Sequence, residues 1–138
     1  MTLWLKDGAT KPGPDAGSAT QGRNKEAVDG RLRCRHCGLA IAKQADLFRL
    51  DGSPSVQVFT NPAGLAFEIC TLSNANNVQE VSEPTTDYSW FRGYRWQIVV
   101  CAGCSSHLGW RFDAVDAEVG PAWFYGLKWA DLVAPEAN

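Results

Sequence analysis

The sequence contains no long apolar run and no excess of positive charge. No stretch approaches the roughly 20 consecutive apolar residues that a membrane-spanning helix requires, and the N-terminus MTLWLKDGATKPGPD lacks the apolar segment of a secretion signal. The 138 residues include 13 Lys and Arg against 15 Asp and Glu, a net charge of −2, with no run of like charge. Because attraction to phosphate needs a basic stripe, we expect no nucleic-acid partner. Because the apolar run and the secretion signal are missing, we expect no membrane partner and a cytoplasmic location.

Cysteine is scarce, but its spacing is informative. Four of the five cysteines form two CxxC pairs, which suit thiolate metal ligands in a reducing compartment better than a disulfide framework. A redox CxxC would need only one pair in a βαβ context, whereas an iron site uses the same ligands and stays open. We expect one structural Zn²⁺, held by Cys34, Cys37, Cys101 and Cys104. Since four thiolates fill the coordination shell, the neighbouring His36 and His107 are not expected to be ligands.

Composition divides the chain into one domain and two tails. Residues 6–30 cannot bury enough apolar surface to offset the entropy of ordering, so we expect a flexible tail over 1–30, in which Trp4 is either docked or free. The predicted domain spans 31–133, and a second tail spans 134–138. Strands are expected where β-branched and aromatic residues gather, at 56–60, 65–72, 94–100, 108–115 and 123–129. With only a helical turn or short helix at 42–48, the sequence predicts a mainly β, mainly antiparallel domain.

Aromatic residues concentrate in the segment DYSWFRGYRW at 87–96 and shortly after it. The period of two in a strand puts Trp96 on one face of 94–100, and it groups Leu108, Trp110 and Phe112 on one face of 108–115. If these two strands pair across the second CxxC turn, Trp96 and Trp110 face the same space. The residues alone leave open whether these rings are ordinary core or a ligand-holding pocket.

Several segments in the same order resemble the CULT domain, the thalidomide-binding domain of cereblon and of its single-domain bacterial relatives. They are Cys34-x-x-Cys37, FTNPAG at 59–64, YSWFRGYRW at 88–96, CAGCSSHLGWRF at 101–112 and WFYGL at 123–127. The resemblance implies a β-tent fold of two antiparallel sheets pinned by the zinc. It also implies a binding site for cyclic imides, such as the glutarimide of thalidomide, and for uracil-like rings.

Carried over residue by residue, the resemblance implies a cage of three tryptophans with a polar edge. The implied ligand-binding residues are Asn61, Pro62, Tyr88, Ser89, Trp90, Trp96, Trp110 and Phe112. The implied ligand is a small cyclic imide or a protein C-terminus that ends in one, bound without catalysis. The chain has no segment for a ubiquitin ligase interface, so that activity is not carried over.

Two other classes of function compete with this interpretation. A methionine sulfoxide reductase of the B type has a related zinc-clamped β architecture but needs an exposed, activated thiol. Its only candidate here is Cys70 in the apolar run FEICTL, which we interpret as a buried, inert thiol. The third class is an interaction module that presents a flat surface to a protein or to RNA ends, of which the acidic balance and the few lysines disfavour RNA.

Overall fold

The structure is a computed structural model that describes residues 30–135. Apart from Gly30, the predicted N-terminal tail with Trp4 lies outside the described residues, and so do residues 136–138 of the predicted C-terminal tail. The predicted domain, 31–133, contains all of the strands described below. Within the described range, no helix is long and apolar enough to cross a membrane.

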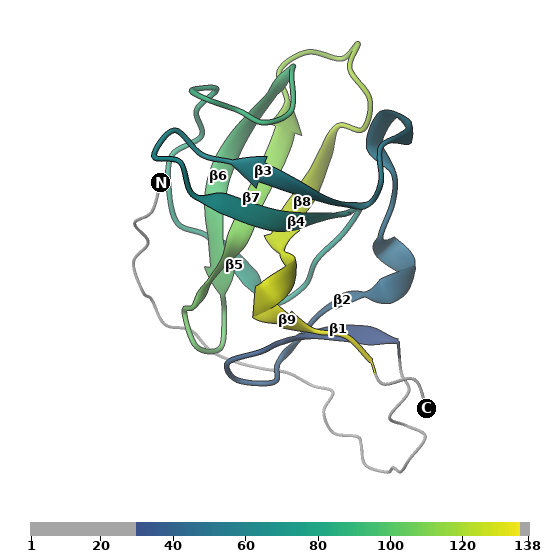
Figure 1. Ribbon diagram of the computed structural model, residues 1–138, viewed down its shortest axis with the longest axis vertical. Coiled ribbons are helices and arrows are strands. Elements are labelled where there is room, and N and C mark those ends of the chain that lie inside the picture. The colour runs from purple at the N-terminus through teal and green to yellow at the C-terminus, as the bar shows by residue number, and fades with distance from the viewer. Residues whose placement is uncertain (1–29, 136–138) are drawn as a thin grey trace.

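Nine strands in the described residues form two antiparallel sheets (Figure 1). The smaller sheet has the order β2-β1-β9, and the larger has the order β3-β4-β8-β7-β6-β5. The strands of the smaller sheet are β1 (Arg31–Cys34), β2 (Ala40–Lys43) and β9 (Leu132–Val133). Those of the larger sheet are β3 (Val56–Thr60), β4 (Ala66–Leu72), β5 (Val78–Glu80), β6 (Tyr94–Cys101), β7 (His107–Ala114) and β8 (Trp123–Lys128). The predicted mainly β fold with two antiparallel sheets is confirmed.

All five strands predicted from composition are present at nearly the predicted positions. The helical turn expected at 42–48 is confined to the 3-10 turn η3 (Gln44–Asp46), because residues 42 and 43 complete β2. Two further 3-10 turns, η4 (Leu50–Gly52) and η5 (Trp129–Asp131), lie in the connections. Strands β1, β2, β5 and β9 were not predicted; each has at most four residues, which is too short for a period of two to be visible.

The two faces of the larger sheet bury different kinds of side chain. One face packs on the smaller sheet through aliphatic residues, among them Leu72, Val99 and Leu127 opposite Leu32 and Ile41. The other face curls around an aromatic cluster; its fully or nearly buried members are Ile69, Phe91, Tyr94, Ile98, Val100, Trp110, Phe112 and Phe124. In Figure 1 the β3–β4 pair crosses in front of β6, β7 and β8, which shows how strongly the sheet curls.

A bulge in the β6–β7 hairpin corrects one sequence-based expectation. The register shifts between Val99 and Val100, so that Val99 pairs with Gly109 while Val100 pairs with His107. Leu108 is the extra residue, and it packs in the aliphatic cluster instead of sharing a face with Trp110 and Phe112. The period-of-two argument failed here because a bulge rotates the residues beyond it to the opposite face.

Close approach of β7 to β8 requires the glycine beside this bulge. A Cβ atom at Gly109 would lie 2.3 Å from the Gly126 carbonyl oxygen and 2.7 Å from the Leu127 Cα. Both obstacles are backbone atoms, which cannot move aside as a side chain would. Gly109 therefore allows the hairpin that carries Trp96 and Trp110 to pack tightly on β8.

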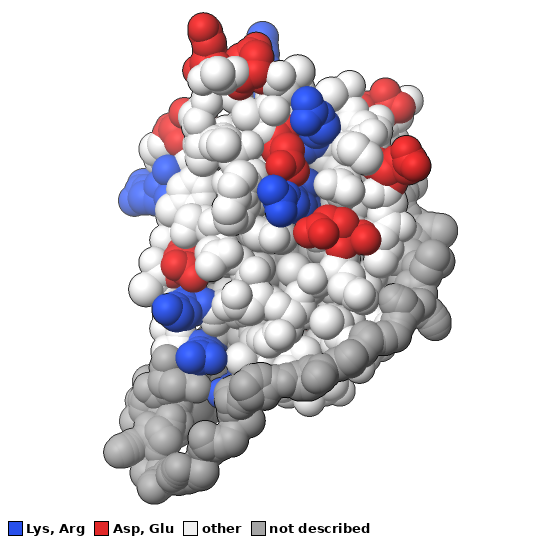
Figure 2. Space-filling view, turned by 180° about the vertical axis from the view of Figure 1, so that it is seen from behind, with Lys and Arg blue, Asp and Glu red and all other residues white. Residues whose placement is uncertain are grey.

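Charged side chains of both signs intermingle on the back of the molecule, where Lys and Arg lie among Asp and Glu (Figure 2). On the larger sheet, Arg111 pairs with Asp113 at 2.9 Å and lies 4.0 Å from Glu80. Its guanidinium carbon is 4.7 Å from the ring centroid of Trp123, which covers the cation from one side. The face that Figure 2 shows therefore has no extended patch of a single charge sign.

Candidate functional site

A pocket of about 310 Å³ opens at the end of the β6–β7 hairpin farthest from its turn. This volume is at the small end of the range for ligand-binding pockets, roughly 300–1,000 Å³. The pocket is lined by Asn61, Pro62, Thr85, Asp87, Tyr88, Trp90, Trp96, Trp110 and Phe112. The structure thus brings together seven of the eight ligand-binding residues that the resemblance implied.

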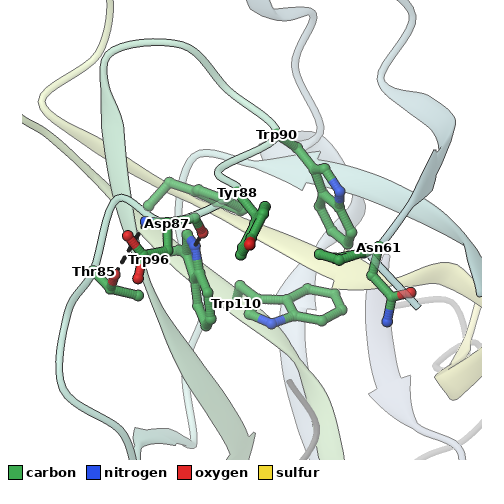
Figure 3. Close-up of a pocket in the computed structure, with 9 residues that line it drawn as sticks. Asn61, Thr85, Asp87, Tyr88, Trp90, Trp96 and Trp110 are labelled. Atoms are coloured by element: carbon green, nitrogen blue, oxygen red, sulfur yellow. Dashed lines mark hydrogen bonds between the residues drawn. The ribbon is translucent and has the colours of Figure 1, made fainter. Parts of the chain in front are cut away.

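Hairpin register and a crossing segment bring the three tryptophans together. In the β6–β7 register Trp96 pairs with Phe112 and Ile98 pairs with Trp110, so Trp96 and Trp110 lie diagonally across the two strands on the same face, two register positions apart. Trp90 comes from the segment before β6 and meets Trp110 edge to face, with ring centroids 4.9 Å apart. Figure 3 shows the three indoles around one space, with Trp110 below Trp90 and beside Trp96.

Each of the three indoles is fixed by its own contacts. The Trp90 Nε1 donates a hydrogen bond to the Thr60 carbonyl oxygen at 3.0 Å, and the Trp96 Nε1 donates to the Asp87 carbonyl oxygen at 2.8 Å. Trp90 also stacks on Phe59, with ring centroids 5.2 Å apart. Trp110 is 2% exposed. Because the two partly exposed indoles have already used their only donor, they offer a ligand aromatic faces and edges instead of hydrogen bonds.

Two of the lining residues, Tyr88 and Trp90, carry backbone groups without a hydrogen-bond partner in the described part of the chain. Among the described residues, the Tyr88 N–H, the Tyr88 carbonyl and the Trp90 N–H have no hydrogen-bond partner. Tyr88 has a φ of +58°, a left-handed conformation that is uncommon for a residue with a large side chain. Within residues 88–90, two N–H donors and three carbonyl acceptors therefore have no hydrogen-bond partner among the described residues.

The β3–β4 turn closes one side of the pocket. The Asn61 Oδ1 accepts hydrogen bonds from the backbone N–H groups of Ala63, at 3.0 Å, and Leu65, at 2.9 Å. This side-chain oxygen organises the turn that carries Pro62, and Asn61 is itself buried. The turn residues predicted as one wall of the pocket thus lie in its lining.

Three positions differ between the implied site and the observed lining. The Ser89 side chain is not in the lining; its Oγ donates to the Phe91 carbonyl at 3.1 Å and accepts from the Phe91 N–H at 3.3 Å. Thr85 and Asp87 do line the pocket and were not predicted. Thr85 forms an isolated bridge with Trp96, a pairing that the loop-like segment SEPTTD gave no reason to expect.

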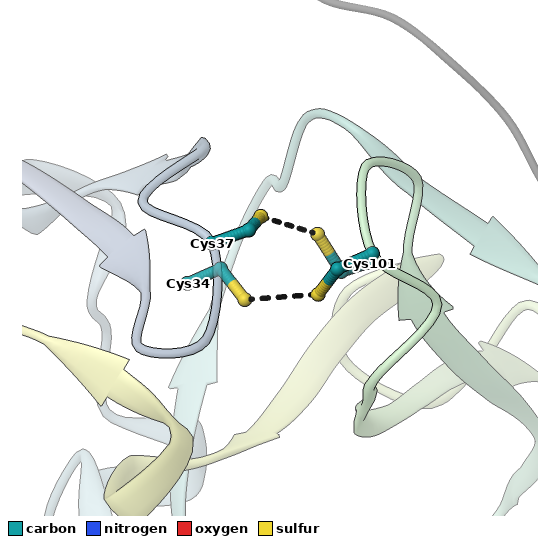
Figure 4. A group of neighbouring side chains, drawn as sticks. Cys34, Cys37 and Cys101 are labelled. Atoms are coloured by element: carbon teal, nitrogen blue, oxygen red, sulfur yellow. Dashed lines mark hydrogen bonds between the residues drawn. The ribbon is translucent and has the colours of Figure 1, made fainter.

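The opposite end of the hairpin carries the four cysteines. Cys34 ends β1 of the smaller sheet and Cys101 ends β6 of the larger sheet, while Cys37 and Cys104 follow in the turns. The two turns share one backbone pattern, in which Gly38 N–H donates to the Cys34 carbonyl and Ser105 N–H donates to the Cys101 carbonyl, both at 2.8 Å. Figure 4 shows the two loops approaching each other with the sulfur atoms between them.

The sulfur positions fit one zinc ion. All four Sγ atoms lie within 4.8 Å of one another, with Cys34 to Cys104 at 3.7 Å and Cys37 to Cys101 at 3.6 Å. Tetrahedral coordination with zinc–sulfur bonds of about 2.3 Å places the sulfurs ~3.8 Å apart. The four cysteines therefore form a structural zinc site that joins the two sheets, as predicted.

The close approach of the sulfurs shifts the pKa values of the Cys34 and Cys101 thiols. The pKa of the Cys101 thiol is lowered to about 5, mainly by a hydrogen bond from the Cys34 side chain and further by backbone N–H groups such as that of Gly103. The same contact raises the pKa of Cys34, because a proton is shared between two close sulfurs. A bound Zn²⁺ replaces these protons and allows all four sulfurs to be thiolates.

The two histidines near the cysteines make hydrogen bonds to other groups. The His36 Nε2 lies 2.9 Å from the Asp131 Oδ1, and the His107 Nε2 lies 3.1 Å from the Gly109 carbonyl oxygen. His107 also meets Trp110 edge to face, with ring centroids 4.9 Å apart. Burial of the His107 ring lowers its pKa to about 4, so the ring is neutral at physiological pH.

The fifth cysteine has the properties predicted for an inert thiol. Cys70 is 0% exposed within the aliphatic cluster between the sheets. Burial raises its pKa to about 12, which is opposite to what a nucleophilic thiol needs. These observations give no support to the methionine sulfoxide reductase hypothesis.

Comparison with known proteins identifies a matching protein family and several similar proteins. Residues 30–133 match the protein family described as Yippee zinc-binding/DNA-binding/Mis18, centromere assembly. Protein cereblon of Drosophila grimshawi is 38% identical over 96 residues, covering 68% of this chain and 14% of the relative. Protein cereblon of Danio rerio is 37% identical over 103 residues, covering 74% of this chain and 24% of the relative.

A third relative agrees with these two. Protein cereblon of Xenopus tropicalis is 37% identical over 97 residues, which cover 70% of this chain and 22% of the relative. The matched part thus spans between 14% and 24% of the length of these three relatives. The similarity concerns one domain of proteins that are several times longer.

Proposed function

This chain belongs to the Yippee-Mis18 family and is a CULT-like domain of the cereblon type, and from that premise we propose that it is a binding module for small, planar cyclic imides. The proposed ligands are the glutarimide ring of thalidomide and its analogues, and uracil-like rings. Trp90, Trp96 and Trp110 would be the walls of the cage, with Phe112 at its base. The proposed role is binding without catalysis.

The observation that carries this proposal is a small pocket with three aromatic walls whose partly exposed indoles have no free N–H. Such walls favour a flat, neutral ring that can lie against aromatic faces over its whole surface. Stacking interactions of this kind contribute about 0.5–1.5 kcal/mol per aromatic pair beyond simple burial. A ligand with charge or with polar groups on every side would have to leave several of them without partners.

The free backbone groups complement the edge of an imide. An imide presents one N–H between two carbonyls, that is, acceptor, donor and acceptor in a row. We propose that the Tyr88 carbonyl accepts the imide N–H while the N–H groups of Tyr88 and Trp90 donate to its carbonyls. These three groups are among the backbone groups of residues 88–90 that have no partner in the described part of the chain. Uracil carries the same sequence of groups around its N3 position.

The same geometry should discriminate against the ring-opened form of the ligand. Hydrolysis of a glutarimide produces a glutaramate, whose carboxylate is charged at neutral pH. Burying an unpaired charge costs far more than burying a hydrogen-bonded imide, and no Lys or Arg lines the pocket. Equal affinity for the closed and opened rings would rule out the cage as the binding site.

Among the described residues, neither the zinc site nor the fifth cysteine supports a catalytic role. Four cysteine ligands leave no open coordination position on the zinc for a substrate. The buried Cys70 thiol is not accessible to a substrate either. For these reasons we assign the pocket to binding and propose no reaction.

The macromolecular partners of this domain are a separate matter from its small ligand. We propose that a protein C-terminus ending in a cyclic imide occupies the cage, because only the terminal ring has to enter it.

Because the matched domain is only 14–24% of the three relatives' length, we carry over no ubiquitin ligase interface. Although the family description includes DNA binding, we propose no nucleic-acid partner, since the net charge is −2 and charges of both signs intermingle on the face that Figure 2 shows. We further propose that the protein acts in the cytoplasm.

Tryptophan fluorescence during titration with thalidomide, uracil and a glutarimide amine tests the proposal. A ring stacked among three indoles should quench the emission, and Trp96→Ala should weaken binding at least tenfold. Trp123→Ala is the matched control, because Trp123 is exposed and lies outside the pocket. If no imide changes the emission of the folded, zinc-loaded protein, the proposed function is wrong although the fold and the zinc site stand.

A further inference from the structure

Tyr88 is the exception among the aromatic residues that line the pocket. Its side chain is in the lining, yet the residue is 77% exposed. Within the described part of the chain its ring meets no other aromatic ring and its hydroxyl makes no hydrogen bond. In Figure 3 the Tyr88 side chain lies between Trp90 and Trp96 and above Trp110, at the mouth of the cage.

The backbone of Tyr88 is nevertheless held on both sides. Before it, the Asp87 N–H donates to the Thr85 Oγ1 at 3.0 Å, and the Asp87 carbonyl accepts the Trp96 indole N–H at 2.8 Å. After it, the Ser89 hydroxyl is bonded to the Phe91 backbone. Tyr88 itself has a φ of +58°, which a large side chain adopts only where its surroundings impose it. A held backbone thus carries an exposed ring that, in the described part of the chain, has no hydrogen bond and no aromatic ring contact.

We propose that the Tyr88 ring is the fourth, movable wall of the cage and selects ligands that carry a second planar ring. This inference rests on the proposed function and adds the part of the ligand that lies outside the cage. The imide fills the space between the three indoles, and the Tyr88 ring stacks on the planar substituent where it leaves the mouth.

The size of the pocket supports a division between the imide and its substituent. The pocket measures about 310 Å³, at the small end of the range for ligand-binding pockets, roughly 300–1,000 Å³. It suits one small ring, and we place a bicyclic substituent on that ring at the mouth. The exposed Tyr88 ring is the aromatic group placed to meet that substituent.

The three indoles cannot perform this selection, because each of them is already fixed. Trp90 and Trp96 are tied by their N–H groups, and Trp110 is almost wholly buried. The three indoles contact only the imide ring, so they should contribute equally to the affinity for substituted and unsubstituted imides. A ring that is free to rotate at the mouth can adjust to substituents of different direction, which gives Tyr88 a role distinct from that of its backbone.

Two substitutions at Tyr88 separate the ring from the backbone and from the hydroxyl. Tyr88→Asn removes the ring while keeping a residue that tolerates a positive φ, and Tyr88→Phe keeps the ring without the hydroxyl. Isothermal titration would compare two probes, unsubstituted glutarimide and thalidomide, on the full-length, zinc-loaded protein. Because Tyr88 is exposed, both variants should unfold at the temperature of the wild type, which a thermal melt checks.

The proposal expects a selective loss. Tyr88→Asn should weaken thalidomide binding by roughly 2- to 10-fold, the value of one aromatic pair, and change glutarimide binding less than twofold. Tyr88→Phe should bind both probes as the wild type does. Equal losses for both probes, or no loss for thalidomide, would overturn the role of the ring while leaving the cage intact. Failure of the wild type to bind either probe would instead overturn the proposed function, and this inference with it.

Discussion

The two ends of the β6–β7 hairpin are held together by different interactions. At the turn end, four sulfur atoms lie within 4.8 Å of one another, and the zinc site joins a strand end of each sheet. At the open end, three indoles are placed by hydrogen bonds and ring contacts, and one side of the space between them is uncovered. Zinc coordination closes the first end completely, whereas the second keeps room for a ligand.

This difference separates stability from binding along one structural element. The zinc site stabilises the folded state because its geometry does not exist in the unfolded chain. The cage indoles contribute less to folding the more they remain exposed, since exposed area is not removed from water. The following experiments test that separation, beginning with the largest expected effect.

Loss of the zinc should unfold the domain. Structural zinc binding contributes about 10–16 kcal/mol in small zinc domains, which exceeds the stability of most domains of this size. A chelator, or the substitution Cys101→Ser, should therefore abolish the cooperative thermal transition and leave less than one zinc per chain by elemental analysis. Cys70→Ser is the control, because it should keep one zinc per chain although the buried thiol is lost. A stable, metal-free Cys101→Ser variant would show that packing alone joins the sheets.

Two tryptophans of the same cage should differ in their effect on stability. Trp110 is 2% exposed, and truncation of such a residue to alanine costs about 3–5 kcal/mol. Trp96 is only partly buried, so Trp96→Ala should cost about 1–2 kcal/mol, mainly one hydrogen bond and some apolar contact. Urea unfolding of both variants measures the difference. Equal costs would mean that the open end of the hairpin is as much core as cage.

His107 begins β7 at the turn end of the hairpin, and its burial makes stability depend on pH. Its pKa is about 4 in the folded protein, mainly because of burial, against 6.5 for the unfolded chain. The unfolded state therefore binds more protons between these values, and the stability present above pH 6.5 is lost as the pH falls towards 4. Between pH 7 and pH 5 this amounts to about 2 kcal/mol.

The variant His107→Gln isolates this effect from loss of zinc in acid, which both proteins share. Urea unfolding at pH 7 and pH 5 should show a larger fall in stability for the wild type than for the variant. The comparison cancels the protonation of the cysteines, because both proteins carry the same four ligands. An identical fall in the two proteins would mean that His107 is protonated in the folded state.

Much of the larger sheet could be predicted from the sequence, because its strands are long enough to show a pattern. The runs VQVFT and YRWQIVV carry β-branched and aromatic residues over five or more positions, and both are strands at nearly the predicted bounds. The smaller sheet could not be predicted in the same way. Its β9 has two residues, Leu132 and Val133, and it is a strand only because β1 is beside it to pair with. Pairing between distant short segments leaves no local signal.

The candidate site shows the same division. The spacing of the four cysteines was sufficient to predict the zinc site, and a resemblance of motifs implied most of the residues that line the pocket. Thr85 and Asp87 were missed because they enter the lining through the bridge between Thr85 and Trp96 and through the Asp87 carbonyl that receives the Trp96 N–H. Both are backbone contacts, which the identity of a side chain does not reveal.

What the sequence by itself determined is the chemistry of each end of the hairpin. Two CxxC pairs provide metal ligands, and the period of two places Trp96 and Trp110 where they face the same side of two paired strands. What only the tertiary structure decided is how the walls meet. Trp90 reaches Trp110 because its indole N–H binds the Thr60 carbonyl, 30 residues earlier in the chain, and the bulge at Val99 moves Leu108 to the opposite face. Such contacts join residues far apart in the chain, and their geometry depends on the closed fold and not on any local pattern of residues.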